Sequence, residues 1–152
     1  MRLGCVSKLP FCASVIFSGA LSTTGINSDI ELYSIKVMDG DNTAPLSRIV
    51  EGIYKALEYN VDIINMSFGT AVNSSILYQA IKEACDKNVL IIASAGNNGE
   101  DTGEVEYPAA YEEVISVGAI DAKGEIAQSS SRGERLIFGH QANLLKQERL
   151  SV

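Results

Sequence analysis

The sequence has few histidine and cysteine residues, which are the usual ligands of zinc, and cysteine is also the residue that forms covalent cross-links. It contains a single histidine, His140, and three widely spaced cysteines, Cys5, Cys12 and Cys85. No CxxC pair and no cysteine–histidine spacing typical of a zinc site occurs. We therefore predict no metal centre, no cofactor and no disulfide framework, and we interpret the cysteines as buried or incidental thiols.

Other function classes are disfavoured by what is missing from the charge and glycine patterns. No lysine–arginine cluster opposes the net charge of −7, so we predict no nucleic-acid partner. Neither GxGxxG nor GxxxxGK followed by Ser or Thr occurs, which argues against a nucleotide-binding domain. Leu9 to Leu21 is too short and too polar to span a membrane. No clean cleavage site follows it, so we predict a buried amphipathic helix over Met1 to Leu21 in preference to a secretory signal.

The residues that are present indicate one folded domain of the α/β class. The hydrophobic content is 46% and the charged content 20%, as in globular proteins. Strand-like apolar segments alternate with two helical periodicities; the strands fall at 32–37, 61–66, 89–93 and 114–119, and the helices at 46–57 and 76–84. This order predicts a parallel sheet with flanking helices and ligand sites at the carboxyl ends of the strands.

Small and polar residues follow two of these strands. Ser67-Phe-Gly69 comes after one strand, and Gly96-Asn97 comes after the next strand along the chain. A side-chain amide on a rigid strand end, such as that of Asn97, can donate to the oxyanion that develops during acyl transfer. Considered alone, a Gly-Asn-Asn-Gly run is more often a plain turn, so both interpretations stay open at this point.

Four segments then occur in a characteristic order: Asn65-Met-Ser-Phe-Gly69, Ala93-Ser-Ala-Gly-Asn-Asn-Gly99, Tyr107-Pro-Ala-Ala-Tyr111 and Val114-Ile-Ser-Val-Gly-Ala-Ile-Asp121. In this order they resemble the middle of a subtilisin-like serine peptidase, or subtilase. The resemblance covers about residues 32–133 and implies an incomplete subtilisin-like three-layer (αβα) domain. We predict a single partial peptidase domain over 1–152, with 1–11 and 137–152 as non-family or poorly ordered sequence.

The resemblance implies a role for each residue at the strand ends. Asn97 matches the oxyanion donor. The segment along which substrate lies as an added strand is matched by Ser67, Phe68 and Gly69. One wall of the pocket for the residue before the scissile bond is matched by Ala93, Ser94, Ala95 and Gly96. The opposing edge is matched by Asn42, Thr43 and Ala44. Ala109 matches the pocket floor, and a weak cation site built of carbonyls is implied near Tyr111 and Val114.

The resemblance also implies a catalytic triad that this sequence does not contain. Subtilases carry Asp, His and Ser in that order, within Asp-Thr/Ser-Gly, His-Gly-Thr-His and Gly-Thr-Ser-Met-Ala motifs, and none of these motifs occurs here. The one histidine, His140, follows Asn97 in the chain. We therefore expect a fragment of a serine endopeptidase, from a truncated or frameshifted reading frame, that is inactive alone.

The expected partners are an extended peptide or protein substrate and complementary subtilase segments, with no membrane partner. The alternative is a non-catalytic peptide-binding module or pseudoenzyme. Subtilases are often secreted, but no convincing signal peptide occurs here, and the localisation stays open.

Overall fold

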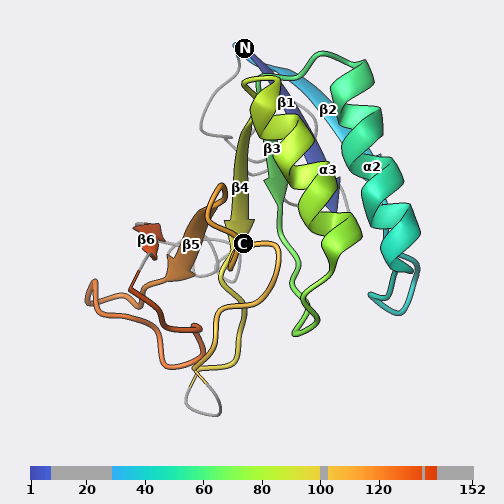
Figure 1. Cartoon of the computed structure of the whole chain (residues 1–152). Helices are drawn as coiled ribbons and strands as arrows, with labels where there is room; N and C mark the ends of the chain where they lie inside the picture. The colour runs from blue at the N-terminus through green and yellow to red at the C-terminus, as the bar shows by residue number, and fades with distance from the viewer. Residues whose placement is uncertain (8–28, 100–102, 135, 140–152) are drawn as a thin grey trace. The chain divides into compact units, whose positions relative to one another are not determined.

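The computed structural model describes residues 1–7, 29–99, 103–134 and 136–139. Its elements are, in chain order, β1 (Arg2–Ser7), β2 (Glu31–Lys36), α2 (Leu46–Glu58), β3 (Ile63–Met66), α3 (Ser75–Asp86), β4 (Leu90–Ser94), β5 (Ile115–Ala119) and β6 (Ile137–Gly139). The strands form a sheet in the order β2-β1-β3-β4-β5-β6 (Figure 1). Strand β1 runs parallel to β2 and β3, and β5 runs parallel to β6. The predicted α/β class with a parallel sheet is confirmed.

The chain divides into two compact units. The first unit comprises Met1–Ser67 and Ser74–Ile92, and the second comprises Phe68–Asn73 and Ala93–Val152. The two predicted helices both belong to the first unit, whereas most predicted site residues belong to the second. None of the helices in the described part of the chain is long and apolar enough to cross a membrane.

In the first unit, two amphipathic helices lie side by side against the strands (Figure 1). Helix α2 buries Ile49, Gly52, Ile53 and Ala56, and helix α3 buries Leu77, Ala80, Ile81 and Ala84. These positions recur every three or four residues, which is why the sequence predicts both helices. The Ser74 hydroxyl caps α3 by accepting a hydrogen bond from the Leu77 amide at 3.5 Å.

Strand β1 corrects the expectation for the amino-terminal segment. Residues Arg2–Ser7 form a strand and not the start of a helix, and Leu3 pairs with Leu32 on one side and Ile63 on the other. Gly4 and Ser7 interrupt the apolar pattern of this segment, and its hydrogen-bonding partners are distant in sequence, so local periodicity could not reveal it. The rest of the predicted helix lies outside the described residues.

The last described residues form a short strand. Residues 137–139 form β6, with Val117 opposite Ile137, within sequence that we expected to be non-family or poorly ordered. Residues 140–152, which include His140, lie outside the described part of the chain.

Hydrogen bonds to loops and strand ends hold the second unit together. Thr70 and Tyr107 form an antiparallel bridge with two backbone bonds of 2.9 Å. The Ser130 hydroxyl accepts from the Ala119 amide at 3.0 Å and donates to the Ser131 carbonyl at 3.1 Å. Both serines are almost fully buried, so their hydroxyls satisfy backbone groups that water cannot reach.

Candidate active site

Asn97 lies in a loop of the second unit that is fixed on both sides. The carbonyl of Gly96 accepts from the Ser131 amide, and the Asn98 amide donates to the Ser131 hydroxyl, both at 3.1 Å. The Asn98 side chain donates to the Glu104 carbonyl at 3.1 Å. Asn97 itself is exposed, and its side-chain amide has no hydrogen-bond partner among the described residues. The loop therefore presents a free amide from a constrained backbone.

The wall predicted at Ala93–Gly96 alternates between buried and accessible side chains. Ala93 and Ala95 are each 1% exposed, whereas Ser94 and Gly96 are half-buried. At Ala93 and Ser94 this alternation follows from the extended backbone of β4, in which successive side chains point to opposite faces. The face that this wall can offer to a ligand is therefore made by Ser94 and Gly96.

The segment Ser67-Phe-Gly69 follows β3. Ser67 is exposed and its hydroxyl accepts from the Asn65 side chain at 3.0 Å. Phe68 is 8% exposed, so this segment offers a ligand its backbone and not the phenylalanine ring. Gly69 is exposed and directly precedes Thr70, which forms the bridge to Tyr107.

The residues predicted to form the opposing edge belong to the first unit. Asn42 adopts a positive φ of 63°, and the turn around it is held by the exposed carboxylate of Asp39. That carboxylate accepts from the Thr43 amide and hydroxyl, both at 3.1 Å, and from the Asp41 amide at 3.2 Å. The backbone amide of Thr43 is the largest influence on the pKa of Asp39 and lowers it, because this hydrogen bond stabilises the charged form. Asp39 thus orders the Asn42–Ala44 segment.

The sequence analysis missed Glu106. Its side chain lies against the Cα atoms of both Gly69 and Gly96, where the atoms nearest to an added β-carbon all belong to Glu106. The Glu106 amide donates to the Ala95 carbonyl at 2.9 Å. Its place directly before Tyr107-Pro108 was the available signal, because that pair belongs to one of the segments that carry the resemblance.

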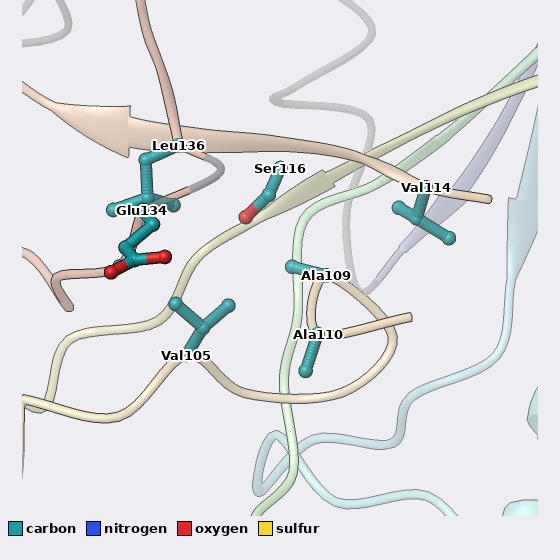
Figure 2. Close-up of a pocket in the computed structure, with 8 residues that line it drawn as sticks. Val105, Ala109, Ala110, Val114, Ser116, Glu134 and Leu136 are labelled. Atoms are coloured by element: carbon teal, nitrogen blue, oxygen red, sulfur yellow. The ribbon is translucent and has the colours of Figure 1, made fainter. Parts of the chain in front are cut away.

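Ala109, which matches the pocket floor by resemblance, lines a hollow of the second unit. This cavity has a volume of about 300 Å³ and is lined by Val105, Ala109, Ala110, Val114, Ser116, Gly133, Glu134 and Leu136. Figure 2 shows the Ser116 hydroxyl pointing from β5 into the space between Val105 and Glu134. The hydroxyl is buried and has no hydrogen-bond partner among the described residues.

The residues of the predicted cation site, Tyr111 and Val114, are both 6% exposed. The Tyr111 carbonyl accepts from the Val114 amide at 3.2 Å, and the Tyr111 hydroxyl donates to the Asn73 side chain at 3.3 Å. Within the described part of the chain, no three histidine, cysteine, aspartate or glutamate side chains are grouped so that they could hold a metal ion. A cation bound by carbonyls stays a prediction.

The chain matches the model of one protein family over most of its length. That family is the Subtilase family, and the match covers residues 11–145. The chain belongs to the subtilase family. This subtilase is similar to subtilisin DY of Bacillus licheniformis, with 38% identity over 114 residues, which are 74% of this chain and 42% of the relative. It is 34% identical to subtilisin E of Bacillus subtilis (strain 168) over 121 residues, 78% of this chain and 32% of the relative.

A third relative is the minor extracellular protease Epr of Bacillus subtilis (strain 168). It is 35% identical over 114 residues, which are 75% of this subtilase chain and 18% of the relative. The chain thus spans less than half the length of each of these three relatives. The family match runs from residue 11 to residue 145, and the motifs that carry the resemblance lie within it, at residues 32–133.

Solved structures share the fold of this subtilase chain. The prenylagaramide maturation protease PagA has a TM-score of 0.80 and 23% identity, and the match covers 91% of this chain and 61% of PagA. The S218A mutant of the protease domain of PatA has a TM-score of 0.80 and 22% identity, with 91% and 66% covered. These likenesses confirm the predicted subtilisin-like fold.

Proposed function

We propose that this chain supplies the oxyanion-binding amide and the substrate edges of a subtilase catalytic domain that cleaves peptides by acyl transfer to a serine. We further propose that the 152-residue polypeptide does not cleave peptide bonds by itself. The observation that carries the proposal is the exposed amide of Asn97, which has no acceptor among the described residues while its neighbours are fixed.

An oxyanion donor is effective when it is already oriented before charge develops. The flanking residues meet this requirement, because Ser131 binds Gly96 on one side of Asn97 and Asn98 on the other. Gly96 has a φ of +104°, a conformation that an L side chain rarely adopts, so the turn that aims Asn97 depends on glycine at this position. Such a constrained amide can bind a negatively charged oxygen with little reorganisation.

An extended peptide is the substrate that these edges suit. The backbone at Ser67-Phe-Gly69 can hydrogen-bond a strand laid beside it, since Ser67 and Gly69 are exposed. At the neighbouring strand end Ser94 has a small side chain and Gly96 has none, which would leave room for a substrate side chain. Main-chain hydrogen bonds would give affinity in such binding, and contacts of the substrate side chains would give specificity.

The nucleophile and general base would come from complementary subtilase segments. The 152-residue sequence has none of the three family triad motifs, and a donor without a nucleophile and base cannot carry acyl transfer through to a covalent intermediate. The chain would then bind substrate, and the partner segments would supply the nucleophile and the general base.

Binding of a product-like peptide tests the role of Asn97. The probe is an extended peptide with a free carboxylate, whose oxygen stands in for the oxyanion. We expect calorimetry to show binding that Asn97→Ala weakens by at least about tenfold, because hydrogen bonds to charged groups contribute about 1.5–3 kcal/mol. The matched control is Gln128→Ala, which removes another exposed amide of the second unit and should leave binding unchanged.

Two results would contradict the proposal. One is peptide hydrolysis by the chain alone that persists in Asn97→Ala and in the presence of a serine-directed inhibitor. The other is the absence of binding by any extended peptide at millimolar concentration. Co-expression with the flanking segments of subtilisin DY, which carry the triad motifs by family, should restore hydrolysis. Peptide binding without such restoration would favour the alternative, a pseudoenzyme or peptide-binding module.

A further inference from the structure

Ser116 carries a buried hydroxyl that pairs with none of the described residues. The side chain is 4% exposed, and its Oγ atom has no hydrogen-bond partner in the described part of the chain. The other buried hydroxyls of the second unit differ, because Ser130 accepts from Ala119 and Ser131 accepts from Asn98. Leaving a buried hydroxyl unpaired costs free energy, and a ligand that pairs with it would remove that cost.

This hydroxyl points into the cavity of about 300 Å³ in the second unit (Figure 2). Besides Ser116, the one polar lining side chain is that of Glu134; the other six lining residues are glycine or aliphatic. Sites for small molecules are of this kind, mostly apolar with a few polar groups, and their volumes begin at about 300 Å³. An ordered water needs about two to four polar partners, so the apolar lining favours an organic molecule over water.

Backbone hydrogen bonds hold the walls of this cavity in place. The Ala110 amide donates to the Glu106 carbonyl at 3.0 Å, and the Arg132 amide donates to the Gly103 carbonyl at 2.8 Å. Ala110 itself lines the cavity, and Arg132 directly precedes Gly133, which lines it from another segment. A cavity built by such fixed segments needs little ordering when a ligand enters, which favours binding.

The lining also defines the charge and the polar group of a suitable ligand. Glu134 is exposed and acidic, and no lining residue is basic, so an anion would be repelled. The hydroxyl of Ser116 can both donate and accept a hydrogen bond. An uncharged molecule with an apolar body and one hydroxyl group therefore matches both polar features of the cavity.

We propose that this cavity binds a small uncharged organic molecule whose hydroxyl group pairs with Ser116 and whose apolar body contacts Val105, Val114 and Leu136. Phenol is a simple molecule of this class. The inference does not rest on the proposed function, because Asn97 takes no part in it. A ligand that binds the folded cavity and not the unfolded chain would also stabilise the second unit.

The test is a titration of the 152-residue chain with phenol, toluene and benzoate at neutral pH, followed by the amide resonances of the lining residues. Toluene replaces the hydroxyl of phenol by a methyl group, and benzoate adds a negative charge to the same ring. We expect phenol to give saturable shifts at the cavity and to bind about fivefold more tightly than toluene, which lacks the hydrogen bond to Ser116. Benzoate should bind more weakly than phenol.

Ser116→Ala should abolish the preference for phenol over toluene and keep the binding of toluene. Retained toluene binding would also show that the variant is folded, so a lost preference could not come from unfolding. The matched control is Ser129→Ala, which truncates an exposed serine of the second unit and should keep the preference.

Four results would overturn the inference. Equal binding of phenol and toluene, or a preference that survives Ser116→Ala, would refute the pairing with Ser116. Tighter binding of benzoate than of phenol would refute the exclusion of anions. Absence of saturable shifts at the lining residues with every probe would refute the site itself. None of these results bears on peptide binding that depends on Asn97, which calorimetry measures separately.

Discussion

The interiors of the two units differ in the kind of side chain that is fully buried. In the first unit the fully buried side chains are apolar and include Ile53, Ile64, Leu77 and Ile81, each 0% exposed. In the second unit the fully buried set includes two hydroxyls, those of Ser130 at 1% and Ser131 at 0% exposure. Apolar burial is non-directional, whereas hydrogen bonds fix distance and angle. The second unit, which contains Asn97, thus has buried hydrogen bonds, and these can fix the orientation of a loop.

The largest test of this comparison is a cavity in the first unit. Ile81→Ala on α3 should lower the free energy of unfolding by about 2–5 kcal/mol, because the side chain is 0% exposed and its removal leaves a void. Urea unfolding followed by circular dichroism measures the loss. The matched control is Ile76→Ala on the same helix, where the side chain is 60% exposed. Its effect should stay within about 0.5 kcal/mol, and equal losses for the two variants would break the comparison.

A smaller effect should follow from one hydroxyl of the second unit. Ser131→Ala leaves the Asn98 amide without its acceptor at 3.1 Å, which should destabilise this loop by about 1–3 kcal/mol. Hydrogen exchange at the Asn98 amide should accelerate while the amides of α3 keep their protection. Ser129→Ala, which truncates an exposed serine two residues earlier, is the matched control. Equal acceleration in α3 and at Asn98 would show that the loop is not stabilised separately.

The smallest effect concerns pH and the Asn42–Ala44 segment. The pKa of Asp39 is lowered in the folded chain, chiefly by the backbone amide of Thr43. Its contribution to the order of this turn is therefore present above the unfolded pKa and is lost as pH falls through the lowered folded pKa. The Thr43 amide resonance should shift in that acidic range, and Asp39→Asn should abolish the shift. Asp41→Asn is the control, and a shift that survives Asp39→Asn would refute the role of Asp39.

The sequence was sufficient for the elements that have a clear local period. Helices α2 and α3 bury residues spaced by three or four positions, and β4 is a nearly continuous apolar run. Strand β1 was not predictable in this way, because its residues became a strand through pairing with Leu32 and Ile63. A local pattern reports what neighbours in sequence do, and it carries no record of such distant partners.

In the candidate site, too, some features follow from the local sequence and others depend on residues that are distant in sequence. The sequence indicated Asn97 and its strand end, since a Gly-Asn pair follows an apolar strand and the ordered segments resemble a subtilase. It did not indicate that Ser131 holds the residues on both sides of Asn97. Nor did it indicate Glu106, which differs from the exposed Glu104 only in its tertiary surroundings.

By itself the sequence determined the family, the order of helices α2 and α3 and of strands β2 to β5, and the identity of the amide that follows β4. Only the tertiary structure decided that a serine 34 positions after Asn97 fixes its loop and that a carboxylate lies between two glycines 27 residues apart. The physical reason is that period and composition act between near neighbours. The positions of a hydroxyl and a carboxylate depend on loops that close over long stretches of chain.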